Sequence, residues 1–313
     1  MAALRIETNG GSRCQWDGLL ARAPRCSLQQ GWAYGEALAV GGIAVQRLLV
    51  RDGRDDRPLA CAQLAQRRLL GLVRAAFLLR GPVWLDGEPD PGLQGQAVAA
   101  IRAFLGRSVL VWAPESATAP PGWRPVVTGY STSWLDLAQP LPVLRRRMRG
   151  TWRHRLGQAE RRGIEVVTES GEAGLRWLLA CNEAHRRKIG YRGPSPAFLR
   201  RVATAALRGG EILLLVAYER QVPLAGVLMV SHGVAATYEV GHVTPRGREL
   251  CAKHLLLWRA IGLLAARGVR WLDLGGIDTL RAPGLARFKL GLGGEVHTLA
   301  GTFVASPFAT SAG

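Results

Sequence analysis

Two adjoining stretches near the C-terminus, WLDLGGID (residues 271–278) and LARFKLGLGGE (residues 285–295), carry the clearest structural signal in the chain. The first predicts a strand that ends in Gly275 and Gly276, where the missing side chains let a ligand approach the backbone at the edge of an α/β sheet. A tight turn with positive φ is the alternative interpretation. In the second stretch, Lys289 precedes three glycines, an unusual composition for a core element, and its ammonium is a candidate to stabilise an oxyanion.

Outward from this stretch, the chain alternates predicted helices with predicted strands, which is typical of α/β proteins. The predicted helices cover residues 31–40, 93–105, 144–162, 173–188, 197–207 and 250–266. The predicted strands cover residues 44–50, 59–66, 74–79, 109–113, 133–137, 164–167, 212–218, 224–231, 235–242 and 271–274.

The two halves of the chain share a short pattern. Residues 49–60 (LVRDGRDDRPLA) and residues 215–225 (LVAYERQVPLA) both read Leu-Val, a charged turn and Pro-Leu-Ala, about half a chain length apart. Chance could produce so short a match, but the strand–turn–strand context of both copies favours duplication. We therefore predict two similar domains, residues 1–141 and 142–313, with the C-terminal segment free to pack back on the first.

The charge balance points to anionic partners. Of the 313 residues 48% are hydrophobic, which is typical of a globular protein, and 41 Lys and Arg against 23 Asp and Glu give a net charge of +18. Most of the basic residues are Arg, so nucleic acid, anionic membrane surfaces and phosphorylated small molecules are the favoured partner classes. A GC-rich genome that replaces Lys with Arg on solvated faces is the alternative explanation.

The cysteines and the apolar stretches indicate in which cellular compartment the protein is expected. Five scattered cysteines without a C-x-x-C pair favour a reduced chain without a metal site. Residues 1–14 contain no apolar stretch typical of a secretory signal, and the longer apolar runs are too short or are interrupted by Arg259. We expect a cytoplasmic protein, in which any membrane contact is peripheral at the inner membrane surface.

An arginine-rich segment, RRRMRGTWRHRLGQAERRG (residues 145–163), is predicted to form one helix that Gly163 closes. Arg146, Arg149 and Arg153 recur at helical spacing and make one face strongly positive. This face is a candidate platform for the phosphates of a substrate or of tRNA, and a solvated basic face is the alternative. Conventional catalytic signatures such as G-x-S-x-G, the P-loop and H-E-x-x-H are absent from the sequence.

Three stretches taken together resemble the FemABX family, which adds amino acids from aminoacyl-tRNA to the peptide of peptidoglycan precursors. They are residues 153–166, residues 258–278 with L-D-L-G-G-I, and residues 284–303 with R-F-K followed by glycines. GWAYGEAL (residues 31–38) and LLRGPVW (residues 78–84) are similar to the first domain of the family. The resemblance covers nearly the whole chain, and the family's coiled-coil insertion has no counterpart, as in a short, solitary form.

The resemblance implies an α/β fold of two tandem GNAT-like (acyl-CoA N-acyltransferase-like) domains, each a mixed twisted sheet flanked by helices. It implies that Lys289, directly after Phe288, stabilises the oxyanion, and that Arg192 contacts the diphosphate of the acceptor. The implied acceptor is a lipid-linked or UDP-linked muropeptide. Aminoacyl-tRNA is then the co-substrate, and no further cofactor is expected.

The chain departs from the family around the acceptor. Phe198 and Glu239 stand where tyrosine is expected, beside Tyr191 and Tyr238. Glu239 is therefore a candidate general base, with Asp273 as a second candidate and substrate-assisted proton transfer as the alternative. These departures leave the identity of the acceptor more open than the reaction class.

Two other functions are compatible with the sequence. An acyl-CoA-dependent N-acyltransferase of the same fold would hold the CoA pyrophosphate on a Q/R-x-x-G-x-G/A loop at a helix start. Residues 246–252 (RGRELCA) contain one glycine, and Glu249 would oppose an anion, so aminoacyl-tRNA is favoured over acetyl-CoA as donor. A catalytically inactive nucleic-acid-binding module fits the charge, but no standard module is recognisable.

Overall fold

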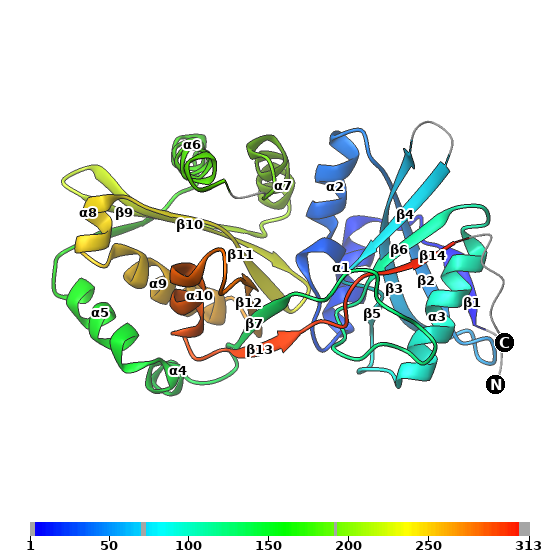
Figure 1. Cartoon of the computed structure of the whole chain (residues 1–313). Helices are drawn as coiled ribbons and strands as arrows, with labels where there is room; N and C mark the ends of the chain where they lie inside the picture. The colour runs from blue at the N-terminus through cyan, green and yellow to red at the C-terminus, as the bar shows by residue number, and fades with distance from the viewer. Residues whose placement is uncertain (1–3, 70–72, 191–192, 307–313) are drawn as a thin grey trace. The chain divides into compact units, whose positions relative to one another are not determined.

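The structure is a computed structural model that describes residues 4–69, 73–190 and 193–306. Its contacts divide the chain into two compact units (Figure 1). Unit 1 comprises Met1–Ser131, His232–Val234 and His297–Gly313, and unit 2 comprises Thr132–Ser231 and Ala235–Val296. The domain boundary that we predict after residue 141 lies beyond β7 (Ser131–Asp136), whose strand pairing is in the sheet of unit 2.

Unit 1 is built, within the described residues, on a seven-stranded sheet of order β1-β2-β3-β4-β6-β14, with β5 paired to β3. Its strands are β1 (Arg5–Thr8), β2 (Ala44–Arg51), β3 (Pro58–Leu69), β4 (Val73–Leu79), β5 (Val83–Trp84), β6 (Val109–Ala113) and β14 (Phe303–Ala305). Its helices are α1 (Arg13–Arg22), α2 (Trp32–Val40) and α3 (Pro91–Phe104), with a short 3-10 turn at Leu28–Gln30. Strands β4 and β6 run parallel, and the other pairs are antiparallel.

Unit 2 has a second sheet, also seven-stranded among the residues described, of order β13-β7-β12-β11-β10-β9-β8. Besides β7, its strands are β8 (Glu165–Thr168), β9 (Ile212–Glu219), β10 (Val222–His232), β11 (Ala235–Val243), β12 (Trp271–Ile277) and β13 (Glu295–Thr298). Its helices are α4 (Leu141–Arg147), α5 (Gly150–Glu160), α6 (Glu172–Ile189), α7 (Pro196–Arg208), α8 (Pro245–Glu249), α9 (Ala252–Ala266) and α10 (Pro283–Leu290).

The two sheets follow one plan. Counted from β1 in unit 1 and from β8 in unit 2, the fourth and fifth strands run parallel (β4 with β6, β11 with β12). Helices lie in the connection between them, as a parallel pair requires. The repeated sequence forms the β2–β3 and β9–β10 hairpins, and the pairing register of both shifts near a proline in the first two residues of the second strand, Pro58 or Pro223. The predicted fold of two α/β domains, each a mixed sheet with helices, is confirmed.

The single helix predicted over residues 144–162 is wrong, because the chain breaks between α4 and α5. Met148 and Arg149 have extended ψ values of 147° and 145°. The backbone N–H of Arg149 donates to the carbonyl of Gly291 at 2.9 Å, and a Cβ on Gly293 would meet the carbonyl oxygen of Arg147 at 2.5 Å. Two of the glycines after Lys289 therefore let the chain pack closely against this break.

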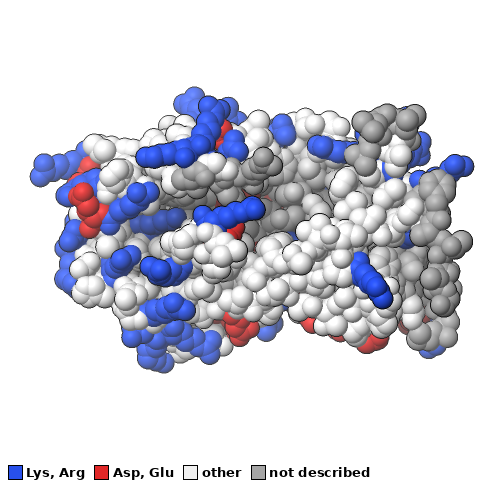
Figure 2. Space-filling model, viewed as in Figure 1, with Lys and Arg blue, Asp and Glu red and all other residues white. Residues whose placement is uncertain are grey.

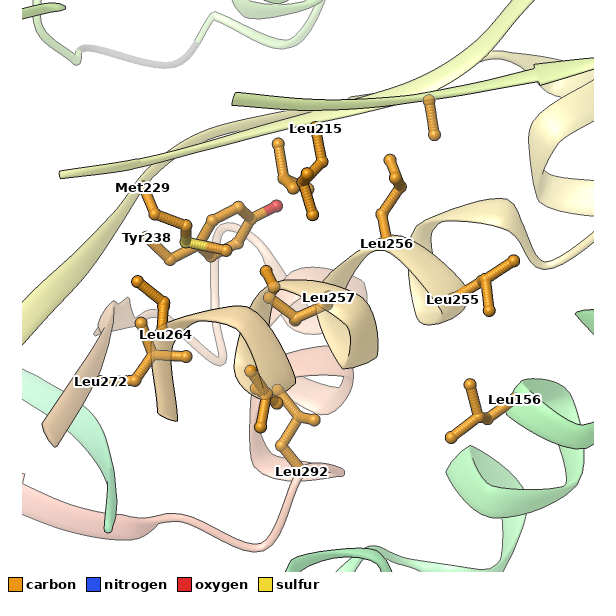
Figure 3. Close-up of a cluster of buried hydrophobic side chains, with 14 of the residues drawn as sticks. Leu156, Leu215, Met229, Tyr238, Leu255, Leu256, Leu257, Leu264, Leu272 and Leu292 are labelled. Atoms are coloured by element: carbon orange, nitrogen blue, oxygen red, sulfur yellow. The ribbon is translucent and has the colours of Figure 1, made fainter. Parts of the chain in front are cut away.

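Helix α9 is fixed to the sheet of unit 2 by an apolar core. Figure 3 shows Leu215, Met229 and Tyr238 of the sheet facing leucines of α9, among them Leu256 and Leu257. These side chains are at most 8% exposed. Their burial holds the first turn of α9 in place, next to the residues of the candidate site. No helix in the part of the chain that the structure describes has the length and apolar composition needed to cross a bilayer.

Candidate active site

The candidate site lies where β11 and β12 stop pairing. The two parallel strands pair from Ala235 with Trp271 as far as Thr237 with Asp273, although β11 continues to Val243 and β12 to Ile277. Ligands of open α/β sheets bind beyond the carboxyl ends of the strands. The separation of these strands therefore marks the position at which side chains of unit 2 can meet a substrate.

Lys289 is a buried ammonium beside this separation. Helix α10 buries Lys289, which is 7% exposed, and its Nζ donates to the carbonyl oxygen of Gly276 at 2.9 Å. Gly275 has a φ of +74°, and a Cβ on it would stand 3.4 Å from Nζ. Burial lowers the pKa of Lys289 to about 8, although the carboxylates of Asp273 and Glu239 oppose this shift. The side chain is therefore mainly charged at neutral pH.

Glu239 has the electrostatic setting of a general base. It extends from the part of β11 beyond the last pair with β12. Burial raises its pKa to about 7, the carboxylate of Asp273 adds to the shift, and the Lys289 ammonium opposes it. A base with a pKa near the working pH combines a deprotonated fraction with useful basicity.

Asp273 is held by hydrogen bonds within unit 2. It is fully buried, and its Oδ1 accepts from the Thr132 hydroxyl at 2.6 Å and from the Gly275 N–H at 2.7 Å. These bonds tie the end of β12 to β7 and fix the left-handed turn at Gly275 below the Lys289 ammonium. Of the two predicted bases, the geometry favours Glu239, and Asp273 has the contacts of a positioning residue.

Sequence reasoning missed a second lysine of the site, Lys253 in the first turn of α9. Its Nζ lies 4.9 Å from the ring centroid of Phe288 and 5.7 Å from that of Tyr238, in cation–π geometry. Burial, with the charge of Arg248, lowers the pKa of Lys253 to about 8, and Lys253 in turn lowers the pKa of Lys289. In the sequence, Lys253 is a single lysine at the start of a long apolar helix. Nothing in that pattern distinguishes it from an ordinary helix start, so it was not recognised as a site residue.

Lys253→Met is expected to raise the free energy of unfolding at pH 7 by about 1 kcal/mol, because it removes a charge held in an apolar setting. The folded-state pKa is lowered, so the full cost of the charge is present below about pH 8. That cost disappears as the pH rises towards about 10.4, the pKa of lysine in the unfolded chain. Thermal unfolding of the wild type and of Lys253→Met at pH 7 and pH 10 measures this cost. If Lys253→Met is less stable than the wild type at pH 7, the Lys253 ammonium does not destabilise the fold.

The other predicted substrate contacts lie in different surroundings. Phe288 packs against both Trp152 and His254, with ring centroids 5.8 and 5.1 Å away. Tyr238 is a core residue: its hydroxyl occupies the space that a Cβ on Gly241 would need, and burial raises its pKa far above the usual range. Two further predicted contacts are placed as follows. Phe198 lies on α7 beneath the guanidinium of Arg201, and Tyr191 and Arg192 fall outside the described residues.

The predicted arginine platform is divided by the α4–α5 break. Arg146 lies in the last turn of α4 and Arg149 lies at the break, and both are exposed. Arg153 donates to the carbonyl oxygens of Arg146 at 2.7 Å and Met148 at 2.5 Å, so it also stabilises the break. Figure 2 shows Lys and Arg side chains gathered over this part of unit 2. Its binding to phosphates stays a prediction.

Residues 246–252, which stand in the place of a CoA-binding loop, already use the backbone of Gly247 for contacts within unit 2. The Thr244 hydroxyl accepts from the Gly247 N–H at 3.0 Å, and a Cβ on Gly247 would meet the Leu224 carbonyl oxygen at 2.3 Å. Arg246 pairs with Glu219 and Glu249. The glycine serves packing, and its N–H is not free for a pyrophosphate. The described residues contain no group of three or more His, Cys, Asp or Glu that could hold a metal ion.

Comparison with known families assigns unit 2. Residues 145–290 match the family described as "Acetyltransferase (GNAT) domain", a range that extends from α4 to the end of α10 and includes Lys253, Glu239, Asp273 and Lys289. Most of unit 2 therefore matches a GNAT domain, and its fold is of the GNAT type. No curated protein matches the chain.

Solved structures match both units together. The crystal structure of FemX aligns over 96% of this chain and 97% of its own, with a TM-score of 0.79 and 14% identity. The chain has a FemABX-like fold. A tandem GNAT protein from the clavulanic acid biosynthesis pathway aligns over 98% of this chain and all of its own length (TM-score 0.52, 14% identity). A C-terminal domain from Agrobacterium fabrum, assigned to a lysylphosphatidylglycerol synthetase, aligns over 95% of this chain and 93% of its own length (TM-score 0.51, 18% identity).

Proposed function

We propose that this chain is an aminoacyltransferase that moves an amino acid from aminoacyl-tRNA to an amine of a peptidoglycan precursor or a similar acceptor. The observation that carries the proposal is the buried Lys289 ammonium, fixed 2.9 Å from the Gly276 carbonyl oxygen and electrostatically coupled to Glu239. A fold shared with FemX supports aminoacyl transfer, and a domain assigned to a lysylphosphatidylglycerol synthetase supports a lipid-linked acceptor.

In the proposed reaction, the amine of the acceptor attacks the ester carbonyl carbon of the aminoacyl-tRNA. A C–N bond forms, and the carbonyl oxygen becomes an oxyanion that the Lys289 ammonium stabilises. The Glu239 carboxylate takes the proton that the attacking nitrogen loses. Collapse of the intermediate breaks the C–O bond, and the tRNA hydroxyl leaves with a proton, which Glu239 can return. An amide and uncharged tRNA are the products, and a tRNA donor requires the reaction to take place in the cytoplasm.

The surroundings of the site favour tRNA over CoA as the donor. The Gly247 N–H, which would face a CoA pyrophosphate, is capped by Thr244. Arg146 and Arg149 supply exposed positive charge at the α4–α5 break, which suits the sugar–phosphate backbone of tRNA. An amino acid donated from tRNA also needs no cofactor that the chain would have to hold.

An acyl-CoA donor is the second candidate, because one observation favours it. Helix α9 begins after Cys251 without a side-chain cap, and Lys253 lies in its first turn. The positive end of a helix dipole, with a lysine in the first turn, favours the binding of a pyrophosphate. The GNAT domain match agrees with this donor as well.

One experiment separates the two donors. The purified chain is incubated with a mixed pool of charged tRNAs and with lipid-linked or UDP-linked muropeptide, and products are read by mass spectrometry. We expect the acceptor mass to increase by one amino-acid residue, and expect the Lys289→Met variant to form this product about 100-fold more slowly. Acetyl-CoA is titrated calorimetrically in parallel. Micromolar binding of acetyl-CoA, together with acetylation of an amine, would replace the tRNA proposal with the CoA alternative.

A further inference from the structure

One end of the unit 1 sheet carries a basic groove of about 440 Å³. Arg67 and Arg68 from the end of β3 and Arg74 from the start of β4 line it, together with Phe104 at the end of α3. A hydrogen bond from the Gln66 amide to the Gln46 side chain, 2.5 Å long, contributes to its lining. The groove therefore combines three guanidinium groups with neutral polar and apolar side chains.

The arginines of the groove repel one another, which lowers the stability of unit 1. Arg68 and Arg74 are cross-strand partners, and Arg67 precedes Arg68 in the same strand. Like charges directly opposite each other destabilise a pair of strands. None of the lining residues is acidic, so the groove itself offers these arginines no carboxylate. An anion bound from outside would remove the repulsion.

The acidic residues of unit 1 gather mostly at the other end of the same elements. Residues 52–56, which contain three aspartates, lie between β2 and β3, at the start of β3. Residues 86–90, with two aspartates and a glutamate, directly precede α3. Strand β3 and helix α3 therefore run from an acidic end to the arginine-lined end. Glu36, on α2, is paired with Arg47 at 3.9 Å.

Exposed apolar side chains surround the groove. Val73, next to Arg74, is 45% exposed, and Phe104 is 42% exposed. Val40 ends α2 and is 73% exposed, four residues before Ala44, the first residue of β2, which lines the groove. Basic residues interleaved with exposed apolar residues are typical of surfaces that lie on a bilayer, where the phosphates meet the guanidinium groups and the apolar side chains enter the interface. A nucleic acid would use the arginines but would leave Val40 and Val73 in water.

We propose that the basic end of unit 1, formed by Arg67, Arg68, Val73, Arg74 and Phe104, binds the surface of a bilayer that contains anionic phospholipids. Headgroup phosphates occupy the groove, and Val73 and Phe104 enter the interface. This surface is independent of the residues proposed for transfer, because all of those lie in unit 2. It would keep the enzyme at the membrane where lipid-linked acceptors are found.

Vesicle sedimentation with the full chain tests the proposal. We expect binding to vesicles of phosphatidylcholine mixed with phosphatidylglycerol, and none to phosphatidylcholine alone. Each arginine near an anionic surface contributes about fivefold, from ~1 kcal/mol, so the triple variant Arg67→Ala/Arg68→Ala/Arg74→Ala should bind about 100-fold more weakly. Val73→Ser/Phe104→Ser should lose the part of the binding that resists high salt.

A matched control removes the same charge elsewhere. Arg176, Arg200 and Arg208 are exposed on α6 and α7, and their triple alanine variant should bind anionic vesicles within twofold of the unchanged chain. Equal weakening by both triple variants would show only a net-charge effect and would overturn the proposal. So would a basic-end variant that keeps vesicle binding but loses affinity for tRNA, which would assign the groove to RNA. Aminoacyl transfer to a UDP-linked acceptor in solution should be unchanged in the basic-end variant, so this test fails or succeeds independently of the proposed function.

Discussion

Lys289→Met is expected to lower the turnover of aminoacyl transfer about 100-fold while unit 2 stays folded. One preorganised donor to an oxyanion contributes on the order of 3 kcal/mol to the transition state, and methionine fills the space without the charge. Stability should change little, because removal of a buried charge offsets the hydrogen bond lost at Gly276, a glycine that the solvent reaches. Single-turnover rates and thermal unfolding of both proteins measure the two effects.

Lys289→Arg is the matched control for charge. The wild-type rate should fall as the pH rises through about 8, because the ammonium that stabilises the oxyanion loses its proton there. A guanidinium stays charged at that pH, so the arginine variant should lose this alkaline decline and keep part of the activity. A methionine variant with the wild-type rate would remove the oxyanion role from Lys289 and, with it, the main support for the transferase mechanism.

The elements that the sequence predicted well are those in which burial and periodicity agree. The apolar runs of β9 and β10 are buried over most of their length, and both strands lie close to their predicted ranges. Helix α1 was missed, although Ser12 and Gln15 form a capping box at its start, because only Trp16 and Leu20 are buried along a polar segment. The local signal was present, but the apolar spacing on which the prediction depended was too sparse.

Apart from Glu239, which the family resemblance indicated, the candidate site was predictable only where its parts are close in sequence. Gly276 and Lys289 are 13 residues apart, on a strand and the helix that follows it, so their motifs could be read together. Thr132, which holds Asp273, is 141 residues away and is brought there by the pairing of β7 in the sheet. Lys253 acquires its low pKa from burial beside Phe288 and Tyr238, which no spacing in the sequence indicates.

Glu239→Gln is expected to lower the rate of transfer by about 100-fold and to abolish the acidic limb of the pH–rate profile. A base works when deprotonated, and burial raises the pKa of Glu239 to about 7, so the wild-type rate should rise as the pH increases through that value. Glutamine keeps the shape of the side chain but cannot take a proton. Rates measured from pH 5 to 9, at saturating concentrations of both substrates, provide the test.

Two neighbours of Glu239, Asp273 and Lys289, provide controls, because their removal should shift the pKa of Glu239 in opposite directions. The Asp273 carboxylate raises the pKa of Glu239, so Asp273→Asn should move the acidic limb to lower pH. The Lys289 ammonium lowers the same pKa, so Lys289→Met should move the limb to higher pH, within its reduced rate. A limb that stays in place in Glu239→Gln belongs to another group, such as the amine of the acceptor, and the base would then be the substrate itself. Opposite shifts in the two neighbour variants, with the limb absent in Glu239→Gln, would assign the proton transfer to Glu239, because the limb would then require the Glu239 carboxyl and respond to both of its charged neighbours with the expected signs.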